Sequence, residues 1–466
     1  MRKTLILCLG LATTLGLVSC SEDEGGVSYS PNPIENTVLK DILVQKGYQF
    51  DANGKLLLDD LANNTTTLDL SGTQISTDAL SELSILPNLK EVDLSENGYG
   101  PAFDFAKLPE QITGVDLTGN EIYDYNNLIN VVIEDNGDEI VTNLLNISKL
   151  YLPEEAKYNC TDLMRFYRQN KDAIMSGSID MQMMNDNGTL QNYTTLRDVP
   201  DATLRTTLQT SFSGLFEGEQ IDLCNYLPLE QRTVGIQIMN NISNFEGLQY
   251  LIQNPSWQGS SITIYSLASD AKVPYFKPSS NVNILYIMNV DMSEGMDLSE
   301  ATSMRMITMG SVKGLTSIDL SHSTVFGQRG LDVEGDPFTG SGLLAIDSPD
   351  LEEILLPSAS ALHASTVDIE CLPSLKTFDL TKFAGINNLT IGDLPDNYNL
   401  VYPTLVDFSS TNNNMTNFAC SQDTWEKEIT KDFVKAYYKD ADPKKLGISV
   451  NLSSTNNVGT TAAFWW

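Results

Sequence analysis

The stretch "LKEVDLSENGYG" (89–100) decides the expected fold, because its pattern recurs on either side of it. "TTLDLSGTQIS" (66–76) precedes it and "TGVDLTGNEI" (113–122) follows it. In each stretch an Asp stands between two aliphatic residues, and a Ser or Thr follows two positions later; the pairs are Asp69 with Ser71, Asp93 with Ser95, and Asp116 with Thr118. Alternation of apolar and polar residues predicts short strands with one buried face.

The spacing of these strands predicts a repeat. They end at Leu70, Leu94 and Leu117, so the steps are 24 and 23 residues. "LPNLKEVDLSEN" (86–97) is similar to the leucine-rich pattern L-x-x-L-x-L-x-x-N. A unit of this length cannot bury its own apolar face, so we expect the units to stack side by side.

A longer block with a similar period begins near residue 230. Its apolar triplets end at Ile238, Ile264, Ile287, Met309, Val333, Leu356, Leu380 and Phe408, in steps of 22 to 28 residues. A second series runs half a period away and ends at Leu320, Ile346, Ile369 and Ile391. The sequence leaves open which of the two series forms the main parallel sheet.

Both blocks are flanked by related segments. "ENTVLKDIL" (35–43) aligns with "PDATLRTTL" (200–208), and "DLMRFYRQ" (162–169) aligns with "DFVKAYYK" (432–439). Each segment has helical apolar spacing, and the first two carry an Asn or Asp at their second position, Asn36 and Asp201, that can cap a helix. We therefore expect two tandem modules with helical caps, residues 34–190 and residues 196–466.

Together with "LVSC" (17–20), which ends an apolar run at the N-terminus, these features resemble the leucine-rich repeat surface lipoproteins of Bacteroidetes, with N-terminal caps similar to those of internalins. The resemblance implies an α/β to mostly β solenoid wound as a right-handed superhelix. It also implies that the chain binds other macromolecules at a cell surface.

The N-terminus resembles a bacterial lipoprotein signal. Arg2 and Lys3 precede an apolar run that closes with "LVSC" on Cys20. The resemblance implies a signal peptide over 1–19, a lipid on Cys20, and an outer membrane lipoprotein that faces the cell exterior. The polar residues 20–33 are expected to form a tether. No other apolar run approaches the length of a membrane span, so the lipid is the only predicted anchor.

Composition excludes some functions. The formal charge of −33 repels nucleic acid phosphates. Neither histidine belongs to a catalytic motif, and "DANGKLLLDDLA" (51–62) lacks the glycine and final glutamate of a calcium loop. We therefore expect a monomer that is not an enzyme and that has no metal or cofactor. Far from one another in the sequence, Cys160, Cys224, Cys371 and Cys420 specify no disulfide pairing.

The candidate binding residues lie at outward positions of the predicted strands. They are Gln237, Thr263, Tyr265 and Tyr286, with Asp379 and Asp407 further along the second block and the ladder of Asp69, Asp93 and Asp116 in the first. The acids either keep one face of the sheet wet or recruit a cation or a basic partner, and the tyrosines are either contact residues or core. The predicted function is to bind a protein or glycan partner. The alternative is an envelope glycoside hydrolase or lyase that uses a carboxylate pair.

Overall fold

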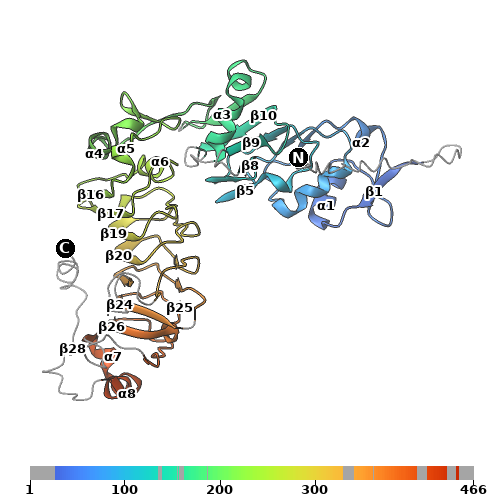
Figure 1. Cartoon of the computed structure of the whole chain (residues 1–466). Coiled ribbons are helices and arrows are strands. Elements are labelled where there is room, and N and C mark those ends of the chain that lie inside the picture. The colour runs from blue at the N-terminus through green and yellow to red at the C-terminus, as the bar shows by residue number, and fades with distance from the viewer. Residues whose placement is uncertain are drawn as a thin grey trace, which may run out of the picture.

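A computed structural model describes residues 27–134, 139–154, 156, 162–185, 187–328, 341–359, 361–406, 417–437 and 448–450. The described part of the chain forms two arms that meet at an angle near helix α3 (Asp162–Met175) (Figure 1). The first arm holds residues 27–193, and the second holds the rest. Each arm has its own buried apolar core.

The first arm is built on a six-stranded sheet in the order β12-β11-β10-β6-β4-β3. Five of the strands run parallel, and β12 closes one edge by pairing antiparallel with β11. The strands are β3 (Thr67–Asp69), β4 (Glu91–Asp93), β6 (Gly114–Asp116), β10 (Lys149–Leu152), β11 (Asp180–Met184) and β12 (Leu190–Asn192). Their inward residues stack in register beneath the sheet; these are Leu68, Val92, Val115, Leu150 and Met181.

Buried asparagines fix the turns after two of these strands. The Asn97 side chain donates to the carbonyl oxygens of Leu70 and Leu94, at 3.0 and 2.9 Å. The Asn120 side chain repeats this one strand further, donating to Leu94 and Leu117 at 3.0 and 2.8 Å. These contacts explain the Asn of the sequence pattern, because they satisfy backbone carbonyls that the turns would otherwise leave buried without a partner.

Short elements cover the rest of the first arm. They are β1 (Tyr29–Pro33), α1 (Thr37–Gln45), β2 (Lys55–Leu57), α2 (Asp60–Asn64), η1 (Thr77–Ile85), β5 (Ala102–Asp104), η2 (Phe105–Lys107), β7 (Asp124–Asn126), β8 (Ile129–Ile133) and β9 (Glu139–Asn143). Strand β1 differs from the predicted tether, since it pairs with β2 and its Ser30 hydroxyl accepts a hydrogen bond from the Leu56 amide at 2.9 Å.

The second arm is built on a ten-stranded sheet. Nine strands follow one path, β16-β17-β19-β20-β22-β24-β26-β27-β28, and β18 pairs beside β19; every pair in this sheet is parallel. The strands are β16 (Ile236–Asn240), β17 (Ser261–Ser266), β18 (Ala271–Lys272), β19 (Ile284–Asp291), β20 (Met306–Lys313), β22 (Gly342–Ile346), β24 (Leu362–Glu370), β26 (Phe383–Gly392), β27 (Asn417–Cys420) and β28 (Ile448–Val450).

The main sheet takes its first strands from one predicted series and its later strands from the other. It starts with the strands of Ile238, Ile264, Ile287 and Met309 and continues with those of Ile346, Ile369 and Ile391. The change occurs where Met309 pairs with Ala345, 345 − 309 = 36 residues later, instead of the 22 to 26 residues between earlier partners. The longer connection shifts the phase of the repeat by about half a period.

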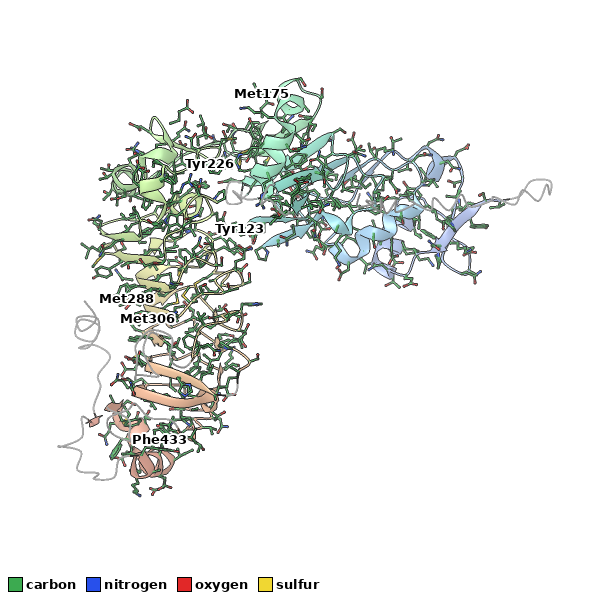
Figure 2. The ribbon with its side chains drawn as sticks, viewed as in Figure 1. Tyr123, Met175, Tyr226, Met288, Met306 and Phe433 are labelled. Atoms are coloured by element: carbon green, nitrogen blue, oxygen red, sulfur yellow. The ribbon has the colours of Figure 1, made fainter. Side chains whose placement is uncertain are left out.

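The remaining second-arm elements cover the core and its ends. They are β13 (Leu196–Arg197), α4 (Ala202–Phe212), η4 (Ser213–Leu215), β14 (Phe216–Glu217), β15 (Gln220–Asp222), α5 (Leu229–Arg232), α6 (Leu248–Ile252), β21 (Ser317–Asp319), β23 (Glu353–Leu355), β25 (Thr377–Phe378), η5 (Leu380–Lys382), α7 (Gln422–Glu426) and α8 (Glu428–Tyr437). At the far end, Phe433 of α8 stacks on Tyr402 with ring centroids 4.3 Å apart (Figure 2).

The predicted right-handed leucine-rich repeat solenoid is wrong. The described residues form seven separate sheets, most of them small, rather than one continuous superhelix. The antiparallel strand β12 ends the first main sheet, so that sheet does not continue into the second. The strands that the main sheet leaves out form a sheet of their own, β21-β23-β25, which takes the strand before Leu320 from the second series and the strands before Leu356 and Leu380 from the first. A period of about 23 residues fixes the parallel pairing of neighbouring strands, but not the continuity of the sheet.

Candidate functional site

The outward face of the second sheet brings several predicted binding residues together. Gln237, Thr263, Tyr286 and Thr308 occupy one register row across β16, β17, β19 and β20. Neighbouring strands lie about 4.8 Å apart, so these side chains are immediate neighbours. Tyr265 lies one outward position further along β17. The alternate residues of the same strands point into the core, which fixes the outward direction of this row.

The two tyrosines are half-buried on this face. Burial, with a smaller contribution from Tyr265, raises the pKa of Tyr286, so its hydroxyl stays neutral. Within the described part of the chain, neither hydroxyl has a hydrogen-bond partner of its own. Each tyrosine therefore offers an apolar ring and a free polar tip, a combination enriched at binding interfaces.

Methionines lie beside the tyrosines. Met239, which is 47% exposed, pairs with Tyr265, and Tyr265 pairs with Met288 on the next strand. Met288 leans over Gly310, where an added Cβ would lie only 2.5 Å from its sulfur. Met288 and Met306 lie on the side of the second arm that is away from the bend (Figure 2). Methionine side chains are flexible and polarizable, so this part of the face can adapt to the shape of a partner.

Further along the same face, strand β24 carries three buried oxygens, Thr366 Oγ1, Asp368 Oδ1 and Glu370 Oε1. Among the residues that the structure describes, none of these oxygens has a hydrogen-bond partner. The Asp368 side chain is in register with Leu344 and Thr390, which donate nothing to it. A buried polar atom without a partner costs about 1–3 kcal/mol, so this strand lowers the stability of the sheet.

The two carboxyl groups have raised pKa values. Burial raises the pKa of Glu370 to about 7, and the charge of Asp393 contributes. Burial and the charge of Glu370 raise the pKa of Asp368 well above its usual range. Both acids are therefore held toward their protonated forms at moderately acidic pH.

The Asp ladder of the first arm has a different environment. Asp69, Asp93 and Asp116 are in register, as the repeat predicts. Each accepts two hydrogen bonds from the residue two positions later, one from its amide at 2.9–3.0 Å and one from its hydroxyl at 2.6–2.7 Å. The bonds from Ser71 lower the pKa of Asp69. The ladder therefore shapes the turns, and no cluster of three or more His, Cys, Asp or Glu in the described residues could hold a metal ion.

Of the remaining predicted positions that the structure describes, Asp379 does not join the outward face of the second sheet. Asp379 follows β25 and accepts from the amide and hydroxyl of Thr381, where it caps η5. Asp407, Cys20 and Cys160 lie outside the described residues. Of the described cysteines, Cys224 and Cys420 are free thiols, and the Cys371 thiol donates to the Asp393 carboxylate at 3.6 Å.

A second site, which the sequence did not indicate, lies where the two arms meet. Tyr123 stacks on Tyr275 with ring centroids 4.6 Å apart, and its hydroxyl donates to Glu294 at 2.6 Å. Tyr123 lies in the bend between the arms (Figure 2). Lys277 of the second arm contacts Asp124 of the first at 2.7 Å. The stacking partners are 275 − 123 = 152 residues apart in irregular segments, so no periodic signal could have paired them.

The charges at this joint are strongly coupled. The Lys277 ammonium also lies 3.4 Å from Asp297 and 3.2 Å from Glu300, and its side chain is only 14% exposed. Burial acts to lower the pKa of Lys277, but the hydrogen bond to Asp124 and the nearby acids raise it above the usual value. Burial raises the pKa of Asp124, and the contact with Lys277 only partly offsets that effect. The lysine therefore neutralises a cluster of acids that would otherwise repel one another.

Two clefts flank the joint. The larger has a volume of about 740 Å³ and is lined by parts of both arms, including Gly98, Glu121, Glu294, Asp297 and Asp319. The smaller, of about 230 Å³, lies beside Asp124, Asp162, Trp257 and Lys277. Burial raises the pKa of Asp162.

Among the described helices, none is long and apolar enough to cross a membrane. Comparison of the chain with protein-family models, curated proteins and solved structures gives no match.

Proposed function

We propose that the chain is a non-catalytic binding protein, anchored to the outer membrane by a lipid on Cys20 and facing the cell exterior. The proposed site for its protein or glycan partner is the outward face of the second sheet around Tyr265 and Tyr286. The single observation that carries this proposal is the register row of Gln237, Thr263 and Tyr286. The hydroxyls of Tyr286 and of the neighbouring Tyr265 have no hydrogen-bond partner within the described ranges. The proposed anchor and location rest on the resemblance of the N-terminus to a lipoprotein signal.

The shape of this face suits an extended partner. The register row crosses the four strands β16, β17, β19 and β20, so about three spacings of 4.8 Å give a row on the order of 14 Å long. Such a length accommodates several residues of a peptide or several sugar units. Rigid strands hold the tyrosine rings in place, which lowers the entropy lost on binding.

The test begins with a glycan array and a pull-down from surface extracts, using the full chain as bait. For a ligand identified in this way, replacement of Tyr265 and Tyr286 by Ala should weaken binding by about 1–3 kcal/mol without unfolding the protein. The matched control replaces Tyr151 and Tyr226, two tyrosines away from this face. Equal losses in both double variants would place the ligand elsewhere, and failure to retain any ligand at micromolar protein would contradict the proposed function.

The buried acids of β24 favour a second candidate function, in which a carboxylate pair cleaves glycans as a glycoside hydrolase or a lyase does. Asp368 and Glu370 share one face of one strand, and both have raised pKa values, as a general acid requires. This candidate is weaker, because Asp368 is only 2% exposed and has no access to a glycosidic bond. Release of reducing sugar from glycans by the wild-type chain, abolished in Glu370→Gln, would favour the enzyme over the binding protein.

A further inference from the structure

We propose that the larger cleft between the arms binds a ligand that carries two or more spaced ammonium groups. Four carboxylates line this cleft, from Glu121, Glu294, Asp297 and Asp319. Its described lining contains no Lys, Arg or His. A cleft lined by one sign of charge concentrates ligands of the opposite sign and repels phosphate, sulfate and acidic sugars.

Most of this negative charge is not neutralised within the protein. Glu121 and Glu294 are exposed and have no ion-pair partner in the described residues. Glu294 only accepts the Tyr123 hydroxyl, which leaves its charge intact. Asp297 shares Lys277 with two other acids, and the one described ion-pair neighbour of Asp319 is His322 at 3.9 Å. Burial acts to raise the pKa of Asp297, but hydrogen bonds from Ser299 and the contact with Lys277 lower it overall, so it is ionised near neutral pH.

The arrangement of these acids favours an organic polycation over a metal ion. A calcium ion needs several oxygens that converge on one point. No group of three or more potential ligands converges in this way within the described ranges. Carboxylates spread along a cleft instead match ammonium groups spaced along a flexible chain, each of which can form charge-assisted hydrogen bonds.

The walls of the cleft are held in place before a ligand arrives. Glu121 belongs to the first arm, and Glu294, Asp297 and Asp319 belong to the second. The stacked Tyr123 and Tyr275 fix the distance between these walls. A volume of about 740 Å³ lies within the ordinary range of small-ligand sites. The required ammonium groups can come from a free polyamine or from the lysines of a peptide.

Spermine and tetralysine serve as probes for these two sources, with binding to the full chain measured by calorimetry at low ionic strength. Replacement of both Glu121 and Glu294 by Gln should weaken binding about tenfold, because two charge-assisted contacts are lost. Gln at 294 can still accept the Tyr123 hydroxyl, so the joint is expected to remain intact. The matched control, Glu110→Gln with Glu230→Gln, removes the same charge from exposed sites outside the cleft and should change affinity less than twofold.

Tight binding of spermine alone supports the polyamine source, and binding of both probes supports basic side chains. Failure of both probes to bind the wild-type chain overturns the proposal. Equal weakening in the cleft variant and the control also overturns it, because the attraction is then due to total charge. If the cleft double variant unfolds at a lower temperature than the wild-type chain, the single variant Glu121→Gln is tested in its place. Loss of this exposed side chain should still weaken binding several-fold, and unchanged affinity would overturn the proposal. These results do not depend on the sheet-face ligand, so the two proposals fail independently.

Discussion

The acidic side chains on the outward faces of the two main sheets differ in their hydrogen bonding. In the first arm, Asp69, Asp93 and Asp116 are each bonded to a hydroxyl two residues later. In the second arm, Asp368 and Glu370 are buried without partners for Oδ1 and Oε1. The same residue type at similar strand positions is therefore part of the turn in one arm and an unsatisfied group in the other.

Several other polar side chains on the two faces differ in their hydrogen bonding in the same way. In the first arm, Tyr151 donates to Asp180 at 2.6 Å and Lys149 pairs with Glu91 at 3.1 Å. In the second, the hydroxyls of Tyr265 and Tyr286 have no partner in the described residues. A surface whose polar groups already bond to one another has little to offer a ligand, whereas unpaired groups gain hydrogen bonds when a partner arrives. This difference favours the second arm as the binding arm.

The contact between the arms at Lys277 and Asp124 links the unfolding of one arm to that of the other. Removing this contact should cause the largest change in stability among these predictions. Lys277→Met removes the ammonium from Asp124, whose side chain is only 13% exposed, and leaves that acid without its cation. We expect the free energy of unfolding to fall by about 2–4 kcal/mol. Urea unfolding followed by circular dichroism and by tryptophan fluorescence measures this change. Residues 27–193 contain no tryptophan, and the described tryptophans, Trp257 and Trp425, lie in the second arm, so the fluorescence does not report on the first arm.

Lys313→Met is the matched control for the joint variant. Lys313 pairs with Asp270 on the surface, where both side chains are 59% exposed, so its loss should cost less than about 1 kcal/mol. After Lys277→Met we also expect the two signals to separate into two transitions. A single shared transition, or equal small losses in both variants, would show that the joint does not couple the arms.

Two acids, Glu370 in the second arm and Asp69 in the first, should contribute to the pH dependence of stability with opposite signs. Glu370 has a raised pKa, so the folded chain binds more protons than the unfolded chain between about pH 4.5 and 7. Its contribution to stability is complete below about pH 4.5 and is lost as the pH rises through about 7. Asp69 has a lowered pKa, so its contribution is present above its ordinary value near 3.8 and is lost as the pH falls below it.

Glu370→Gln tests this sign. Wild-type second-arm stability, followed by fluorescence, should fall on the order of 1–3 kcal/mol between pH 5 and 8, and the variant should lose much of that fall. Glu230→Gln changes an exposed acid without a hydrogen bond and should leave the profile unchanged. A second arm that becomes more stable between pH 5 and 8 would contradict the assigned environment of Glu370.

The sequence pattern predicts the repeating strands, but it does not predict how these strands are divided among sheets. The alternation around Leu68, Val92 and Val115 predicted both the strands and their register, because inward residues must stack to be buried. The same period could not show that β12 ends the first sheet, or that a longer connection shifts the second sheet from one series to the other. Sheet edges and connection lengths depend on contacts that a local pattern does not contain.

The candidate sites show the same limit. Gln237, Thr263 and Tyr286 could be placed in one row because strand pairing in register follows from the repeat. Asp379 could not be placed correctly, since it follows a strand of the other sheet and caps a short helix. The joint and its clefts depend on how two arms pack, and only three-dimensional contacts such as Tyr123 with Tyr275 reveal them.

Two substitutions that each remove one hydroxyl, one in each main sheet, should have the smallest effects on stability. They test the difference between the two sheets most directly. Ser95→Ala removes the 2.6 Å hydrogen bond to Asp93 but leaves the amide bond at 3.0 Å, so the chain should lose about 0.5–1 kcal/mol. Thr366→Val removes a buried hydroxyl that has no partner and keeps the shape of the side chain. Its effect should lie between zero and a gain of about 1 kcal/mol, since an unsatisfied polar atom is replaced by a methyl group in a strand that favours β-branched residues. Urea midpoints from circular dichroism for the first variant and from tryptophan fluorescence for the second give both values. A loss of stability in Thr366→Val as large as that in Ser95→Ala would mean that Thr366 has a partner after all. The difference between the two faces would then lie in the tyrosines alone.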